Sequence, residues 1–139
     1  MSILGLDLGE KRIGVAIAEA PSFVAVPLMV LEAEPWKAFV DHLRQLTQER
    51  AVEKLVVGLP LQTNGREGQA AKAAREMAEK LGAACGLPVA YQDERFTSNA
   101  AEDALAHTAL KPSRRQKRRD AVAAALILEA FLSSAREES

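Results

Sequence analysis

The first 31 residues contain three apolar runs separated by connections too short to hold a helix. The runs cover residues 3–8, 13–18 and 24–31, and the connections are polar or contain proline. Short apolar runs bounded by turn residues are typical of strands. Because parallel neighbours need a connection of about a dozen residues or more, these three strands are predicted to be antiparallel.

Helices and strands alternate in the rest of the chain. Apolar residues at helical spacing predict the helices, and short β-rich runs predict the strands. In chain order these are a helix over 35–50, a strand over 52–59, a helix over 67–81, a strand over 87–92, a short helix over about 97–110 and a helix over 113–133. This order predicts an α/β fold with a mixed five-stranded sheet and helices packed on its faces.

The helix over 67–81 is rich in alanine. Its predicted apolar stripe consists of Ala70, Ala73, Ala74, Met77 and Leu81. Gly82 and Gly86 are expected to supply its C-terminal stop.

Length and composition bound the domain organisation. A chain of 139 residues, 48% of them hydrophobic, is expected to form one domain over residues 1–139. The first residues lack the pattern of a signal peptide, and no segment predicts a membrane span. Cys85 has no second cysteine to pair with, which favours a reducing, cytoplasmic setting.

Asp7 is an acidic residue in an otherwise apolar strand. An unpaired carboxylate there would lose hydration at considerable cost, so something must compensate its charge. A bound metal cation is one explanation, and an ion pair with Lys11 or Arg12 is the alternative. Gly5 and Gly9 leave room on either side for a ligand or another backbone segment.

Glu94 ends the fifth predicted strand in the run Asp93-Glu94-Arg95. Ligand-binding groups gather at the carboxyl ends of strands in open α/β sheets. Neighbouring strand residues point to opposite faces, so one of the two acids is expected to join Asp7, and the spacing leaves open which one. The alternative is a solvated turn in which Arg95 neutralises both acids.

Asp120 precedes a long apolar stretch of the last predicted helix. Residues 124, 127, 128 and 131 share its helical face, so its side chain is predicted to point toward the core. An intrahelical contact with Gln116 or Lys117 is the alternative. Three acids so far apart in sequence can meet only through the fold.

A basic cluster precedes Asp120. Six of the nine residues from 111 to 119 are Lys or Arg, although the whole chain has a net charge of −1. The members of this basic cluster are Lys111, Arg114, Arg115, Lys117, Arg118 and Arg119. We expect the cluster to bind a nucleic-acid backbone without reading its sequence, and a merely solvated charged surface is the alternative.

Four sequence blocks together resemble a known family over nearly the whole chain. They are GLDLGEKRIGVA at 5–16, VVGLPL at 56–61, DERFT at 93–97 and DAVAA at 120–124. In this order they resemble the YqgF family, also called RuvX or Holliday-junction-resolvase-like proteins and named as pre-16S rRNA nucleases. The chain departs from the family pattern at QTNG, residues 62–65, where an acidic residue usually precedes the glycine, and at Phe96, which replaces a common leucine.

The resemblance implies an RNase H-like fold, with a mixed five-stranded sheet whose first three strands are antiparallel and helices on both faces. It implies that Asp7, Glu94 and Asp120 bind divalent metal, Mg²⁺ or Mn²⁺. It also implies a nuclease that acts on precursor ribosomal RNA or on branched or single-stranded DNA, and processing of pre-16S rRNA is the favoured function.

Three carboxylates suit a two-metal phosphodiesterase. Hard divalent cations prefer oxygen ligands, and two of them about 3.5–4 Å apart activate water and stabilise the leaving oxygen. In that arrangement Asp7 would bridge the ions, and Glu94 and Asp120 would each complete one side. The residues expected to hold phosphates near the metals are Lys11, Arg12 and Arg95.

Two other function classes stay open. An Asp-x-Gly turn also resembles the phosphate loop of sugar kinases and actin-like ATPases, but those proteins need a second such loop and domain, which the sequence lacks. A non-catalytic RNA-binding module for ribosome assembly would keep the acids as structural residues. Junction resolution normally needs a dimer, because it makes two symmetric cuts. We expect a monomer or a weak homodimer.

Overall fold

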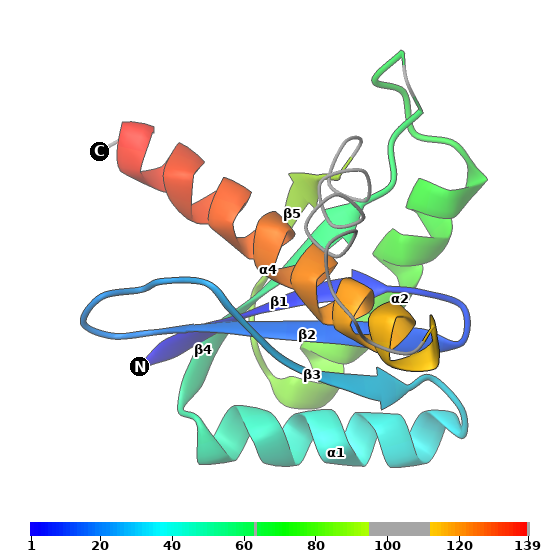
Figure 1. The fold of residues 1–139 in the computed structure, drawn as a ribbon, viewed down its shortest axis with the longest axis horizontal. Coiled ribbons are helices and arrows are strands. Elements are labelled where there is room, and N and C mark those ends of the chain that lie inside the picture. Colours follow the sequence, from blue (N-terminus) through cyan, green and yellow to red (C-terminus); the bar gives the residue numbers. More distant parts are fainter. Residues whose placement is uncertain (63, 95–111, 139) are drawn as a thin grey trace.

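Five strands form one mixed sheet in the computed structural model, which describes residues 1–62, 64–94 and 112–138 (Figure 1). The elements are β1 (Ser2–Leu8), β2 (Arg12–Glu19), β3 (Val26–Glu32), α1 (Trp36–Glu49), β4 (Val52–Leu59), α2 (Gln69–Cys85), β5 (Val89–Asp93) and α4 (Pro112–Glu138). At the ends of α4, over residues 112–117 and 136–138, only the backbone is described. The short helix predicted over about 97–110 lies outside the described residues.

The strands lie in the order β3-β2-β1-β4-β5. β1 pairs antiparallel with β2, and β2 pairs antiparallel with β3. β4 is parallel to both β1 and β5, because α1 and α2 carry the chain back across the sheet between these strands. The predicted mixed sheet with three antiparallel strands is confirmed.

Helices cover both faces of the sheet (Figure 1). On one face, Leu4 and Leu6 of β1 pack with Phe39 and Leu43 of α1, and all four side chains are buried. α2 completes this layer with Leu81. The apolar stripe predicted for α1 is confirmed, because its core-facing side chains recur at helical spacing.

α4 crosses the other face, where the sheet carries small side chains. Ala16 and Ala18 of β2 pack there with Ile127 and Leu128 of α4. A Cβ atom at Gly5 would lie 2.9 Å from the carbonyl oxygen of Ala124, so the α4 backbone lies close against β1. Gly5 therefore leaves room for the backbone of α4. This is one of the two roles predicted for it, the other being room for a ligand.

The limits and the buried face of α2 differ from the prediction. The helix begins at Gln69 and ends at Cys85. Its buried face consists of Ala71, Ala74, Ala78, Leu81 and Gly82, whereas Ala70 and Ala73 of the predicted stripe are exposed. Alanine occurs on several sides of this helix, so its sequence gives little contrast between a buried face and an exposed face.

Gly82 does not stop α2. The αL residue that caps the helix is Gly86, whose φ is 67°. Gly82 serves packing instead, because a Cβ atom there would lie 2.7 Å from Cγ2 of Val89 at the start of β5. Across the described ranges, no helix is both long and apolar enough to cross a membrane.

Candidate active site

Asp7 lies near the end of β1, on the face of the sheet that α4 covers. Gly5, two residues earlier, contacts α4, and alternate residues of a strand share a face. The cross-strand partner of Asp7 is Gly14 of β2. A Cβ atom at Gly14 would collide with the backbone carbonyl of Asp120. The missing side chain thus lets the Asp120 segment of α4 settle on the sheet next to Asp7.

Glu94 follows β5 and reaches the same face. Its backbone N–H donates to the carbonyl oxygen of Leu59 at 3.2 Å, which fixes it at the carboxyl end of β4. A Cβ atom at Gly58 would lie 2.5 Å from Oε2 of Glu94 and 2.5 Å from Cδ1 of Ile127 in α4. The Glu94 carboxyl group therefore lies over Gly58, on the α4 face of the sheet.

Glu94 and Asp7 form a hydrogen-bonded pair of carboxyl groups. Burial raises the pKa of Glu94 to about 8, and the neighbouring charge of Asp7 adds to the rise. Burial also raises the pKa of Asp7, against the hydrogen bond from Glu94. At neutral pH Glu94 is therefore the protonated member, and its O–H donates to the Asp7 carboxylate. Glu94 is thus an acid that contacts Asp7, and the nearby charge of Asp93 adds to the rise in the pKa of Glu94.

Asp120 is the third acid of the cluster, and its charge raises the pKa of Asp7. Its carboxylate accepts a hydrogen bond from Nε of Arg12 at 3.0 Å. The prediction that Asp120 points toward the core is confirmed, since its side chain is 26% exposed and Ala124, Ile127 and Leu128 are buried. The ion pairs among the described residues do not include one between Asp7 and Arg12.

The side chains of Asp7, Glu94 and Asp120 are not arranged as a complete metal-binding site. Among the described residues, no three His, Cys, Asp or Glu side chains are arranged as a metal-binding group. Instead, Glu94 donates a hydrogen bond to Asp7, and Asp120 forms an ion pair with Arg12. The donor set is nevertheless made only of carboxylate oxygens, which suit Mg²⁺ or Mn²⁺.

The predicted phosphate-binding residues are placed in part. Lys11 is exposed in the turn between β1 and β2, and Arg12 is half-buried against Asp120. Arg118 is exposed and Arg119 is half-buried on α4. Arg95 and Lys111 lie outside the described residues, as do the side chains of Arg114, Arg115 and Lys117.

A contact that the sequence did not indicate orders the loop between β4 and α2. Arg75 of α2 donates from Nε and Nη2 to the two carboxylate oxygens of Glu67, at 2.6 and 3.0 Å. Its guanidinium also lies 4.5 Å from the ring centroid of Tyr91, on the strand that leads to Glu94. Glu67 is predicted to lie in the helix, but it lies in the loop before α2, where its carboxylate accepts hydrogen bonds from Arg75.

The sheet order and the helix across one face are those of an RNase H-like fold, and Asp7, Glu94 and Asp120 lie near one another on the face that α4 covers. Thermus thermophilus RuvC in complex with a Holliday junction substrate superposes with a TM-score of 0.58 over 96% of each chain, at 17% identity. The Fowlpox virus resolvase bound to Holliday junction DNA also gives 0.58, over 96% of this chain and 98% of the resolvase, at 10% identity. At such identities these likenesses concern the fold alone.

Residues 1–134 match the family model described as "RuvX: Holliday junction resolvase". A protein of Chloroflexus aurantiacus named "Putative pre-16S rRNA nuclease" is 42% identical over 96% of this chain and 88% of its own. A protein of the same name from Thermosynechococcus vestitus is 43% identical over 96% of this chain and 89% of its own. The chain belongs to the RuvX family, and its relatives carry the names of nucleases.

Proposed function

We propose that this protein is a metal-dependent nuclease that hydrolyses phosphodiester bonds in precursor 16S ribosomal RNA. The observation that carries the proposal is the acidic cluster, in which Asp7 is hydrogen-bonded to Glu94 and lies within the electrostatic influence of Asp120. Gathering three carboxyl groups in a partly buried site is costly, and such clusters with shifted pKa values are found most often at functional sites. The names of the relatives support the choice of substrate.

Asp7, Glu94 and Asp120 are the residues that would hold Mg²⁺ or Mn²⁺. Glu94 would first give up the proton that it donates to Asp7, because carboxylates ligate in the ionised form. Asp120 would leave Arg12 or share its second oxygen. Bound divalent metal supplies an activated water and neutralises the charge that develops at the cleaved phosphate.

The basic residues would bind and orient the substrate. An Arg12 released by Asp120 would have its guanidinium next to the acids, where it would hold a phosphate oxygen. Lys11 is exposed beside it, and Arg95 directly follows Glu94 in the sequence. The basic cluster at the start of α4 would neutralise phosphates of the nucleic acid at a greater distance from the cleaved bond. Binding through this cluster would weaken as the salt concentration is raised.

Cleavage by purified protein tests this function. The substrate is a 16S rRNA that still carries its precursor ends, incubated with Mg²⁺, Mn²⁺ or EDTA. We expect cleavage with either metal, none in EDTA, and none by Asp7→Asn. Asp41→Asn is the matched control, because it removes an exposed aspartate of α1 on the opposite face of the sheet. Full activity in EDTA, or in Asp7→Asn, would defeat the metal mechanism. Binding without cleavage under every condition would favour the non-catalytic RNA-binding module.

Holliday junction resolution is the second candidate, favoured by the description of the matching family model. It differs in the assembly it needs, because two symmetric cuts call for two active sites related by a twofold axis. Light scattering with and without a four-way DNA junction separates the two candidates. A dimer that forms on the junction and cuts it symmetrically would favour resolution, whereas a monomer that cuts only RNA would favour rRNA processing.

A further inference from the structure

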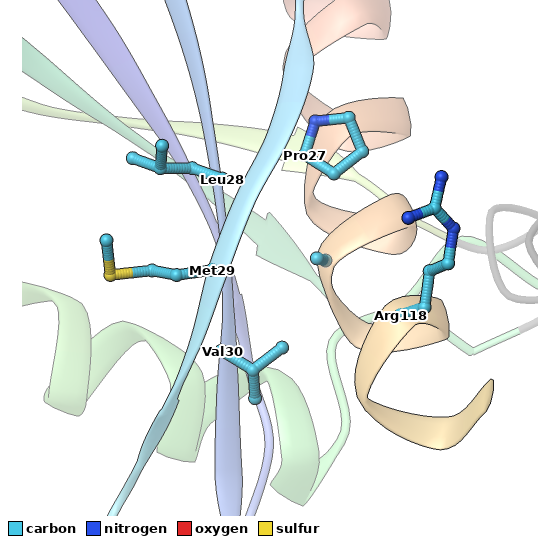
Figure 2. Close-up of a pocket in the computed structure, with 6 residues that line it drawn as sticks. Pro27, Leu28, Met29, Val30 and Arg118 are labelled. Atoms are coloured by element: carbon cyan, nitrogen blue, oxygen red, sulfur yellow. The ribbon is translucent and has the colours of Figure 1, made fainter. Parts of the chain in front are cut away.

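A groove runs between β3 and the first half of α4, beside the acidic cluster. Its volume is about 280 Å³, and its lining consists of Pro27, Leu28, Met29, Val30, Arg118 and Ala121 (Figure 2). This volume lies just below the range of about 300–1,000 Å³ typical of small-molecule sites. A ligand of modest size, or one unit of a polymer, fits such a space.

The groove combines an apolar wall with a cation. Pro27 and Val30 point toward α4, whereas Leu28 and Met29 point to the opposite side of the strand (Figure 2). Arg118 is exposed at the rim, and it forms no ion pair within the described part of the chain. A guanidinium beside an apolar surface suits a ligand that carries both a negative charge and a flat, weakly polar body.

Val30 of the groove lies in one line of cross-strand partners with Asp7. Asp7 pairs with Gly14, and Gly14 pairs with Val30 of the groove. Two strand spacings of about 4.8 Å put Val30 about 10 Å from Asp7. A few nucleotides of one strand span that distance, at a rise of about 3.4 Å each in a stacked helix. Because the Asp120 backbone lies over Gly14, between Asp7 and Val30, a strand cleaved at the acids would cross the first half of α4 to reach the groove, a path of several nucleotides.

A second protein strand is a poor occupant, although β3 is an edge strand. Pro27 has no N–H to donate to a neighbouring strand. The pairing of β3 with β2 also shifts register between Val15 and Ala16, which marks a bulge. Proline and bulges are devices that keep edge strands from pairing. These features and the cation of Arg118 favour a nucleotide over a β-strand partner.

We propose that this groove holds one unpaired nucleotide of the substrate strand, several nucleotides from the cleaved bond. Its phosphate binds the Arg118 guanidinium, and its base lies against Pro27, Val30 and Ala121. The inference rests on the proposed function and adds a requirement to it: a base that is paired and stacked in a duplex does not enter the groove. The substrate must be single-stranded at that position.

Binding in EDTA tests the groove apart from metal and catalysis. The probes are a short fluorescein-labelled single-stranded RNA and the same RNA annealed to its complement, read by fluorescence anisotropy. Arg118→Ala removes the cation, and Arg44→Ala, an exposed arginine of α1, removes the same charge elsewhere. Pro27→Asp puts a carboxylate beside Arg118, and Pro27→Ser is its neutral control. Thermal melts check that all four variants are folded.

We expect Arg118→Ala and Pro27→Asp to weaken binding of the single strand about tenfold, the effect of losing one charged hydrogen bond. Arg118→Ala should also reduce the salt slope by about 0.7, the share of one phosphate on a single strand. Arg44→Ala should change little, as should binding of the duplex, whereas Pro27→Ser, which loses apolar surface without adding a charge, should weaken binding less than Pro27→Asp. An abasic probe adds a second readout: loss of the base at one position should weaken binding to wild type but not to Pro27→Asp.

Three results would overturn the proposal. These are equal losses in Arg118→Ala and Arg44→Ala, equal losses for the duplex and the single strand, and no binding of single-stranded RNA by wild type. Cleavage with Mn²⁺ is measured separately. If wild type cleaves RNA but the groove variants bind like their controls, the proposed nuclease function stands and the groove proposal fails. If binding depends on the groove but wild type does not cleave, the groove proposal stands and the nuclease function fails.

Discussion

Nε of Arg12 lies 3.0 Å from Oδ2 of Asp120, so the first residue of β2 is tied to the first half of α4. The two side chains are 23% and 26% exposed. This ion pair compensates the Asp120 carboxylate, while the shared proton compensates the contact between Asp7 and Glu94. The acidic cluster is therefore held by one arginine and one proton, and both compete with a cation for the same oxygens.

Arg12→Gln should change metal binding and catalysis in opposite directions. Losing the competitor for Asp120 should raise Mn²⁺ affinity, measured by calorimetric titration, whereas losing a phosphate ligand should lower the cleavage rate. Stability should fall by about 1 kcal/mol or less, because both partners are partly solvated. A lower Mn²⁺ affinity in Arg12→Gln would show that the arginine supports the metal site instead of competing with it. Arg44→Gln, on the opposite face of the sheet, is the control.

The stability of the metal-free protein should fall as pH rises. Glu94 keeps its proton up to a pKa of about 8 in the folded protein, whereas the unfolded chain releases it near the ordinary value of 4.5. Between these values the folded state binds more protons, so the free energy of unfolding decreases with pH. The raised pKa of Asp7 acts in the same direction. Melting temperatures in EDTA from pH 5 to pH 9 measure the effect.

Glu94→Gln should flatten that pH profile, because glutamine keeps an N–H donor toward Asp7 and carries no titrating proton. Glu53→Gln, an exposed glutamate of β4, should leave the wild-type profile unchanged. Parallel profiles for wild type and Glu94→Gln would mean that Glu94 does not hold a proton in the folded protein.

Gly14→Ala should destabilise the fold by about 1–3 kcal/mol, the cost of forcing extra atoms into a packed contact. The added methyl group would meet the backbone of Asp120, which cannot rotate away as a side chain can. Gly68→Ala is the control, because the nearest atom there, at 2.8 Å, is the flexible Nε2 of Gln62. Urea unfolding measures both variants, and equal stabilities would contradict the close approach of α4 to β2.

The sequence indicates the acids better than it indicates their partners. Asp7 stands out because a lone carboxylate in an apolar strand needs an explanation. The partner of Asp120 is Arg12, 108 residues away, and no local spacing predicts such a contact. The contact of Glu94 with Asp7 depends on how β5 ends beside Leu59, a detail that pairing with β4 decides.

For the fold as well, features set by local sequence could be predicted, and features set by tertiary packing could not. The three antiparallel strands could be predicted because they are short apolar runs bounded by turn residues, and α1 because its apolar residues recur at helical spacing. The buried face of α2 could not, because Ala70, Ala71, Ala73 and Ala74 are chemically alike. Which of them is buried depends on how the helix packs against the sheet.

Thermal melts of wild type and Asp7→Asn, each in EDTA and in Mn²⁺, test the metal-site account of Asp7 most directly. Asp7→Asn removes one charge from a cluster of buried acids at nearly constant shape, so its melting temperature in EDTA should equal or exceed that of wild type. Mn²⁺ should raise the melting temperature of wild type and should raise that of Asp7→Asn much less. At a Mn²⁺ concentration a hundred times the dissociation constant, the free energy of unfolding of wild type should increase by about 2.7 kcal/mol. If Asp7 were instead one half of a structural ion pair, Asp7→Asn would lose about 3–5 kcal/mol in EDTA, and that result would contradict the account.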